Sequence, residues 1–237
     1  MKIIVKENYK EMAASCADFI CAYINKNPGR LLCFAAGDTP LAILKKLIEM
    51  QETGRVNLSS VYYAGLDEWE GLGYEDKGSC MQVMQDNFYG PAKIESERLR
   101  VFDGKADAEA ETSAVLDFIK DKGGIGLAML GIGMNGHIGF NEPGTLPDFE
   151  GGRVVLSDNS LNVGQKYFDK AQDLKYGVTL GIKTLVAAEK VMLVASGEKK
   201  ADIIARSLSA SNEPALPASY LADHPDYHVF LDKSARA

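Results

Sequence analysis

Uninterrupted apolar runs recur along this 237-residue chain and constrain its fold more than any other feature. Two of them, residues 31–35 (Leu-Leu-Cys-Phe-Ala) and 125–130 (Ile-Gly-Leu-Ala-Met-Leu), carry no charged side chain. Runs of this kind are typical of parallel strands that are buried on both faces of a sheet. Strands are therefore expected at residues 3–5, 31–35, 61–66, 100–102, 125–130, 178–180, 191–194 and 228–231.

Helical patterns separate these runs. Met12, Cys16, Phe19 and Tyr23 recur at three- and four-residue spacing, as on the buried face of an amphipathic helix. Further helices are expected at residues 41–52, 78–88, 115–119 and 199–208. This alternation predicts an α/β fold, with an open, mostly parallel sheet and helices on both faces in a modified Rossmann-like arrangement. No linker or repeat is recognisable in the sequence, so one domain over residues 1–237 is expected.

The charge balance and the cysteines limit the class of protein. The 26 basic and 33 acidic side chains give a net charge of −7, which argues against nucleic-acid or anionic-membrane partners. No apolar run approaches the ~20 residues of a membrane-spanning helix, and the charged N-terminus does not resemble a signal peptide. The four cysteines form no Cys-x-x-Cys pair, and only three histidines occur. We therefore expect a cytoplasmic protein with no metal site.

Loops at the carboxyl ends of the strands are where an open parallel sheet binds its ligands. The first such loop, residues 37–40 (Gly-Asp-Thr-Pro), opens a predicted helix. It is either a plain helix cap or a phosphate seat in which free backbone amides face the ligand. The carboxylate of Asp38 opposes the second interpretation unless it turns away. Four loops of this kind are expected to hold the site, and they follow Ala35, Leu66, Leu130 and Val194.

The second loop begins with two adjacent carboxylates, Asp67 and Glu68, followed by Trp69. Neighbouring side chains of an extended segment point to opposite sides, so one carboxylate can face the cleft while the other faces elsewhere. A carboxylate shielded by Trp69 would have a raised pKa and could act as a base. A solvated acidic loop is the alternative.

The third loop, residues 131–144, contains a formal Gly-x-Gly-x-x-Gly match of the dinucleotide-binding type. Gly139 and Pro143 interrupt the helix that should follow it, and no acidic residue is placed to hold a ribose, so nicotinamide binding is not expected. The glycines instead allow the backbone to wrap around a small ligand. They also place His137 near Asn135 and Glu142, where a carboxylate can orient the imidazole. This arrangement favours acid–base catalysis over a structural histidine.

Two lysines are candidate partners for an anionic ligand. Lys199 follows the strand expected at residues 191–194, at a strand-to-helix turn from which it can reach the cleft. Lys166 lies in the segment Gln-Lys-Tyr-Phe-Asp and has a weaker case. Solvated surface lysines are the alternative for both.

Together, these loops resemble those of the glucosamine-6-phosphate deaminase (isomerase) family, which shares its fold with the 6-phosphogluconolactonases. Residues 66–72 (Leu-Asp-Glu-Trp-Glu-Gly-Leu) are similar to the family's acidic motif. Residues 136–144 (Gly-His-Ile-Gly-Phe-Asn-Glu-Pro-Gly) are similar to its long signature loop. The lactonases keep the Gly-His pair but continue without Phe-Asn-Glu-Pro. The resemblance covers nearly the whole chain, with the motifs in the same order.

The resemblance implies roles for the catalytic residues. Asp67 would move a proton between C2 and C1 of an open-chain sugar. His137, oriented by Glu142, would open the pyranose ring. Family members often have aspartate at the position of Asn135, so this chain has one negative charge fewer beside the imidazole. No metal or organic cofactor is implied.

The resemblance also implies a set of substrate contacts. The first loop is similar to the family's phosphate loop, although glycine is usual where Asp38 stands. Lys199 matches the lysine that holds the phosphate, and Lys166 falls where some members have an arginine with the same role. The expected substrate contacts are Gly37, Asp38, Thr39, Glu68, Gly136, Lys166 and Lys199.

The implied reaction converts glucosamine 6-phosphate into fructose 6-phosphate and ammonia. Because Asp38 departs from the family's pattern, galactosamine 6-phosphate, which would give tagatose 6-phosphate, is an alternative substrate. A 6-phosphogluconolactonase and a non-catalytic sugar-phosphate sensor are further alternatives, but neither needs Asp67 as a base for a C–H bond. Val154 and Val155 stand where allosteric members have basic effector contacts. We therefore expect a monomer or small homo-oligomer that N-acetylglucosamine 6-phosphate does not activate.

Overall fold

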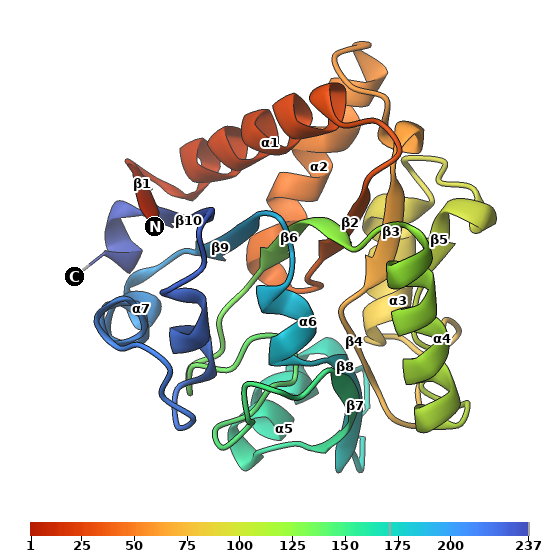
Figure 1. The fold of residues 1–237 in the computed structure, drawn as a ribbon, viewed down its shortest axis with the longest axis vertical. Coiled ribbons are helices and arrows are strands. Elements are labelled where there is room, and N and C mark those ends of the chain that lie inside the picture. Colours follow the sequence, from red (N-terminus) through yellow and green to blue (C-terminus); the bar gives the residue numbers. More distant parts are fainter. Residues whose placement is uncertain (171, 237) are drawn as a thin grey trace.

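A seven-stranded, entirely parallel sheet forms the centre of the molecule (Figure 1). The computed structural model describes residues 1–170 and 172–236. The strand order is β1-β10-β9-β6-β2-β3-β5, which confirms the predicted α/β fold with a mostly parallel sheet. The strands are β1 (Lys2–Lys6), β2 (Leu31–Phe34), β3 (Tyr62–Gly65), β5 (Leu99–Arg100), β6 (Ile125–Leu130), β9 (Val191–Ala195) and β10 (Tyr227–Asp232).

Helices cover both faces of this sheet, because successive side chains of each strand point to opposite faces. In β2, Leu32 and Phe34 join the hydrophobic cluster under α1 (Tyr9–Lys26) and α2 (Asp38–Glu52). Leu31 and Cys33 join the cluster on the other face. That second cluster is covered by α4 (Ala108–Asp121), α6 (Ile182–Val186) and α7 (Ala201–Ser209).

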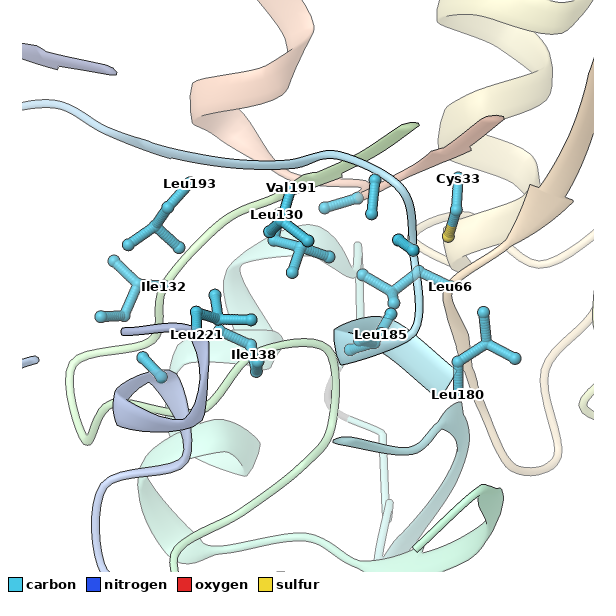
Figure 2. Close-up of a cluster of buried hydrophobic side chains, with 14 of the residues drawn as sticks. Cys33, Leu66, Leu130, Ile132, Ile138, Leu180, Leu185, Val191, Leu193 and Leu221 are labelled. Atoms are coloured by element: carbon cyan, nitrogen blue, oxygen red, sulfur yellow. The ribbon is translucent and has the colours of Figure 1, made fainter. Parts of the chain in front are cut away.

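The second cluster is drawn in Figure 2. Leu130 of β6, Val191 of β9 and Leu185 of α6 belong to it, and all three side chains are fully buried. Ile138, from the glycine-rich loop after β6, is also fully buried in this cluster. The loop is therefore anchored in the core on one side, which holds its other residues at the carboxyl end of β6.

Three more strands form a separate antiparallel sheet in the order β4-β8-β7, seen at the bottom of Figure 1. These are β4 (Asp67–Trp69), β7 (Gly151–Val155) and β8 (Tyr176–Leu180). The strand expected at residues 178–180 exists, but its assignment to the parallel sheet is wrong. Four of the five β8 residues are buried, so its sequence resembles that of a central strand although its partners are different.

The remaining elements are short. Residues expected as one helix at 78–88 form α3 (Cys80–Met84) followed by a π-helical turn, η2 (Gln85–Tyr89). α5 (Asp158–Gly164) adjoins the small sheet. None of the helices in residues 1–170 and 172–236 is both long and apolar enough to cross a membrane. The 3-10 turns are η1 (Leu58–Ser60), η3 (Ser96–Arg98), η4 (Gln165–Tyr167), η5 (Glu198–Lys200), η6 (Pro217–Leu221) and η7 (Lys233–Ala235).

Candidate active site

A cleft of about 230 Å³ opens at the carboxyl ends of β2, β3, β6 and β9. All four loops predicted to hold the site contribute to its lining, and α5 with η4 supplies a further wall. The polar and charged residues of the lining come from segments far apart in the sequence. They are Asp38, Thr39, Asp67, Cys80, His137, Asn159, Ser160, Lys166, Tyr167 and Lys200.

Asp67 lies at the start of β4, directly after β3 ends, and its side chain lines the cleft. Burial raises the pKa of this carboxyl, the neighbouring charge of Glu68 raises it further, and a hydrogen bond with Cys80 lowers it, so that the pKa is about 7. A carboxylate with a pKa near neutrality is suited to accept a proton and to return it. This position supports the predicted role as a base.

Glu68 faces away from the cleft, as the alternation of an extended segment requires. It is buried and accepts hydrogen bonds from the Ser79 hydroxyl (2.7 Å) and from the backbone amides of Cys80 (2.9 Å) and Met81 (2.8 Å). The structure therefore does not bring Glu68, an expected substrate contact, into the cleft. Its carboxylate instead holds the first turn of α3, which places Cys80 beside Asp67.

His137 lines the cleft from the glycine-rich loop, and a carboxylate lies behind it. Its Nδ1 is 3.6 Å from Glu142 Oε2 and 3.1 Å from the Ser160 hydroxyl. Asn135 donates a hydrogen bond from Nδ2 to the same Glu142 oxygen at 2.8 Å. The structure thus brings together three of the predicted catalytic residues, with His137 in the cleft and the other two in support.

The carboxylate of Glu142 is held in its ionised form. Burial raises the pKa of Glu142, but hydrogen bonds with His137, Ser160 and Asn135 outweigh burial and lower it to about 2. The backbone amide of Ser157 donates a further hydrogen bond to the other Glu142 oxygen at 3.3 Å. An ionised partner at Nδ1 fixes the orientation of the ring.

Two glycines of this loop have different roles. Gly133 packs on His137, and a Cβ built at Gly133 would lie 2.4 Å from Cε1 and Nε2 of that ring. Gly136, with φ of +86°, lies outside the cleft lining and packs on Leu216, 2.2 Å from where its Cβ would be. The structure therefore does not bring Gly136, a predicted substrate contact, to the cleft, and this residue serves the packing of the loop.

The N-terminus of α2 faces the cleft through Gly37, Asp38 and Thr39. Gly37 is the residue before the helix, with φ of +133°, and no side chain caps the helix. The alternative of a plain helix cap therefore fails. The carboxylate of Asp38 turns to Lys166 instead, with 2.6 Å between Oδ2 and Nζ. The first turn of α2 remains able to receive an anion.

Lys200, rather than Lys199, faces the cleft beside this turn. Lys199, the lysine predicted to contact the ligand, is exposed and does not line the cleft. Lys200 donates a hydrogen bond to the carbonyl oxygen of Ile132 at 2.6 Å. Burial and repulsion by Lys166 lower the pKa of Lys200. A partly buried cation that is repelled by a neighbouring cation is well placed to bind an anion.

Ser160, Tyr167 and Cys80 are cleft residues that the sequence analysis missed. Their segments lack apolar runs or glycine-rich loops, and no local pattern marks a serine that will meet a histidine 23 positions away. Lys200 could have been found, because it adjoins the lysine that was chosen. Within residues 1–170 and 172–236, no group of three or more His, Cys, Asp or Glu side chains is arranged to hold a metal ion.

Known proteins of one family are similar to this chain over most of its length. The profile of the family "Glucosamine-6-phosphate isomerases/6-phosphogluconolactonase" matches residues 6–229. A glucosamine-6-phosphate deaminase of Thermoanaerobacter pseudethanolicus is 35% identical over 99% of this chain and 94% of its own length. A glucosamine-6-phosphate deaminase of Clostridium botulinum is 33% identical over 99% of this chain and 97% of its own length.

Solved structures show the same similarity. A protein described as a monomeric glucosamine-6-phosphate deaminase superimposes with a TM-score of 0.95, at 30% identity, over 99% of this chain and 98% of its own. The 6-phosphogluconolactonase of Trypanosoma brucei superimposes with a TM-score of 0.80 at 17% identity, over 99% and 97% of the two chains. At that identity the second comparison concerns the fold alone.

Proposed function

Because this chain belongs to the family of glucosamine-6-phosphate isomerases and 6-phosphogluconolactonases, we propose that it is a glucosamine-6-phosphate deaminase. The enzyme converts glucosamine 6-phosphate and water into fructose 6-phosphate and ammonia. One observation carries the proposal: Asp67, His137 and two lysines, which are distant in the sequence, line a single cleft. The 35% identical relative with this activity supports the same substrate.

His137 opens the pyranose ring in this proposal. Ring opening needs a group that gives a proton to the ring oxygen and takes one from the C1 hydroxyl. The ring of His137 faces the cleft, while Nδ1 is held by Glu142 and Ser160. The nitrogen that is left for the sugar is therefore Nε2, and the ionised Glu142 stabilises the protonated imidazole between the two transfers.

Asp67 then moves the proton that makes the reaction an isomerisation. It removes the proton at C2 of the open chain and delivers it to C1. A second proton passes from the nitrogen to the C1 oxygen, so that the carbon bearing nitrogen becomes an imine. Water hydrolyses this imine to the ketone and releases ammonia. The pKa of about 7 supports both halves of the transfer, because neither form of the carboxyl is strongly favoured at neutral pH.

The phosphate binds at the other end of the cleft. Lys166 and Lys200 provide two positive charges, and the uncapped first turn of α2 provides backbone amides. Binding energy from this remote group orients C1 and C2 against Asp67. The substrate contacts that remain in the proposal are the backbone of Gly37, Asp38 and Thr39 and the side chains of Lys166 and Lys200.

The test offers the 6-phosphates of glucosamine, galactosamine and mannosamine to the purified chain and measures ammonia release. We expect turnover of glucosamine 6-phosphate, with loss of activity in Asp67→Asn. Lys199→Met, which changes an exposed lysine outside the cleft, is the control variant. Preference for galactosamine 6-phosphate would contradict the substrate. Hydrolysis of 6-phosphogluconolactone without ammonia release from any amino sugar would contradict the reaction class.

We further infer a cytoplasmic monomer or small homo-oligomer that N-acetylglucosamine 6-phosphate does not activate. The monomeric deaminase that superimposes over 99% of this chain supports the low oligomeric state. Light scattering on the purified chain tests it. A sigmoidal dependence of rate on substrate that this effector makes hyperbolic would contradict the absence of activation.

A further inference from the structure

A negatively charged side chain of the protein already lies at the end of the cleft where we place the phosphate. Asp38, the first residue of α2, and Lys166, in η4, form an ion pair with 2.6 Å between Oδ2 and Nζ. Both residues line the cleft. Their side chains are 67% and 48% exposed, so an incoming ligand can reach the pair from solvent. The contact joins two segments that are 128 positions apart.

The backbone holds the Asp38 carboxylate at this place. The Tyr9 hydroxyl of α1 donates hydrogen bonds to the carbonyl oxygens of Asp38 (2.9 Å) and Thr39 (3.0 Å). On the other side, the Tyr167 hydroxyl lies 3.8 Å from where a Cβ of Gly37 would be. The first turn of α2 is thus hydrogen-bonded to Tyr9 on one side and lies close to Tyr167 on the other.

The charges at this end of the cleft favour a dianion only in part, because a carboxylate lies beside the two lysines. Lys166 and Lys200 contribute two positive charges, and Asp38 contributes one negative charge. Although burial lowers the pKa of Lys166, the hydrogen bond with Asp38 raises it, which indicates a favourable pair. A bound phosphate must therefore take Lys166 from Asp38 or share it, and it must also tolerate the nearby carboxylate.

We propose that Asp38 competes with the substrate's phosphate for Lys166 and thereby weakens phosphate binding. The proposal rests on the proposed function, because it takes the Lys166 end of the cleft as the phosphate subsite. Removing the carboxylate charge frees Lys166 and removes the repulsion. For an exposed pair of this kind, we expect about threefold to fivefold tighter phosphate binding, with a smaller gain at high salt.

The experiment measures binding of inorganic phosphate by calorimetry to the wild-type chain, Asp38→Asn and Asp169→Asn. Asp169→Asn is the matched control, because Asp169 pairs with Lys77 through exposed side chains at the same 2.6 Å and neither residue lines the cleft. We expect tighter binding by Asp38→Asn alone. Equal binding by all three proteins, including none in any of them, or weaker binding by Asp38→Asn would overturn the proposal.

A double-substitution cycle with Lys166→Met assigns the effect to the pair. If Asp38 acts by holding Lys166, the tighter binding caused by Asp38→Asn should be mostly lost when Lys166 is absent. The same gain with and without Lys166 would overturn the competition. These measurements are independent of turnover. Failure of the proposed function would appear as absence of ammonia release, whatever the phosphate affinities are.

Discussion

Replacing Asp67 with asparagine tests the cost of ionising this carboxyl in the folded protein. Burial and the charge of Glu68 raise its pKa from 3.8 to about 7. Each unit of pKa difference corresponds to about 1.4 kcal/mol, so the ionised carboxylate destabilises the fold by up to about 4 kcal/mol at pH 8. Asparagine carries no charge, so the Asp67→Asn variant avoids this cost. It should therefore be more stable than the wild-type chain at this pH.

The sign of this effect fixes its pH dependence. Between pH 3.8 and about 7, the folded wild-type chain holds a proton at Asp67 that the unfolded chain has released. Its free energy of unfolding therefore falls with rising pH across this window and levels off above it, relative to the variant. The advantage of Asp67→Asn should grow from less than about 1 kcal/mol at pH 4 to about 4 kcal/mol at pH 8.

Urea denaturation of both proteins at pH 4, 6 and 8 measures the difference. Asp117→Asn is the matched control, because Asp117 is an exposed aspartate in α4, outside the cleft, and its replacement should change stability little at any of these pH values. A stability difference between wild type and Asp67→Asn that is constant from pH 4 to pH 8 would refute the raised pKa. A variant that is less stable at pH 8 would refute it as well.

The proposed base, the loop glycine and the cleft lysine lead to three further predictions for ammonia release. Because Asp67 must be ionised to act, kcat/KM should rise about tenfold per pH unit below pH 7 and level off above it. Gly133→Ala should lower kcat about tenfold or more, because its Cβ would displace the His137 ring, as steady-state kinetics can measure. In the same assay, Lys200→Met should raise KM about tenfold or more while Lys199→Met leaves it unchanged.

Each of these predictions has a clear contrary result. A rate profile that is flat from pH 5 to pH 8 would exclude Asp67 as the titrating base. Full activity in Gly133→Ala would mean that the position of the His137 ring is not critical. Equal effects of the two lysine substitutions would mean that the orientation of Lys200 into the cleft does not determine phosphate binding.

The sequence predicted the parallel strands well, because a strand buried on both faces must be apolar throughout and this requirement is local. It also located the four loops of the cleft, since parallel strands bring their carboxyl ends to one edge of a sheet. Asp67 and His137 were found for the same reason: each follows such a strand within a distinctive motif. Their side chains line the cleft as predicted.

Whether a predicted residue lines the cleft also depends on the direction of its side chain and on distant partners. Glu68 follows Asp67 directly, and only the path of β4 and the position of α3 determine which carboxylate is buried. Lys199 and Lys200 are likewise neighbours, and the start of α7 determines which lysine reaches the carbonyl of Ile132. A prediction from local sequence patterns cannot distinguish two residues that are neighbours in the chain.

The α/β architecture and the motifs at the strand ends could be predicted from local runs of side chains. Three features instead depend on tertiary packing: β8 joins an antiparallel sheet, Ser160 reaches His137, and Asp38 pairs with Lys166. The physical reason is that burial and charge pairing are properties of residues brought together in space. A local pattern shows what a side chain is able to do, and the fold determines what it meets.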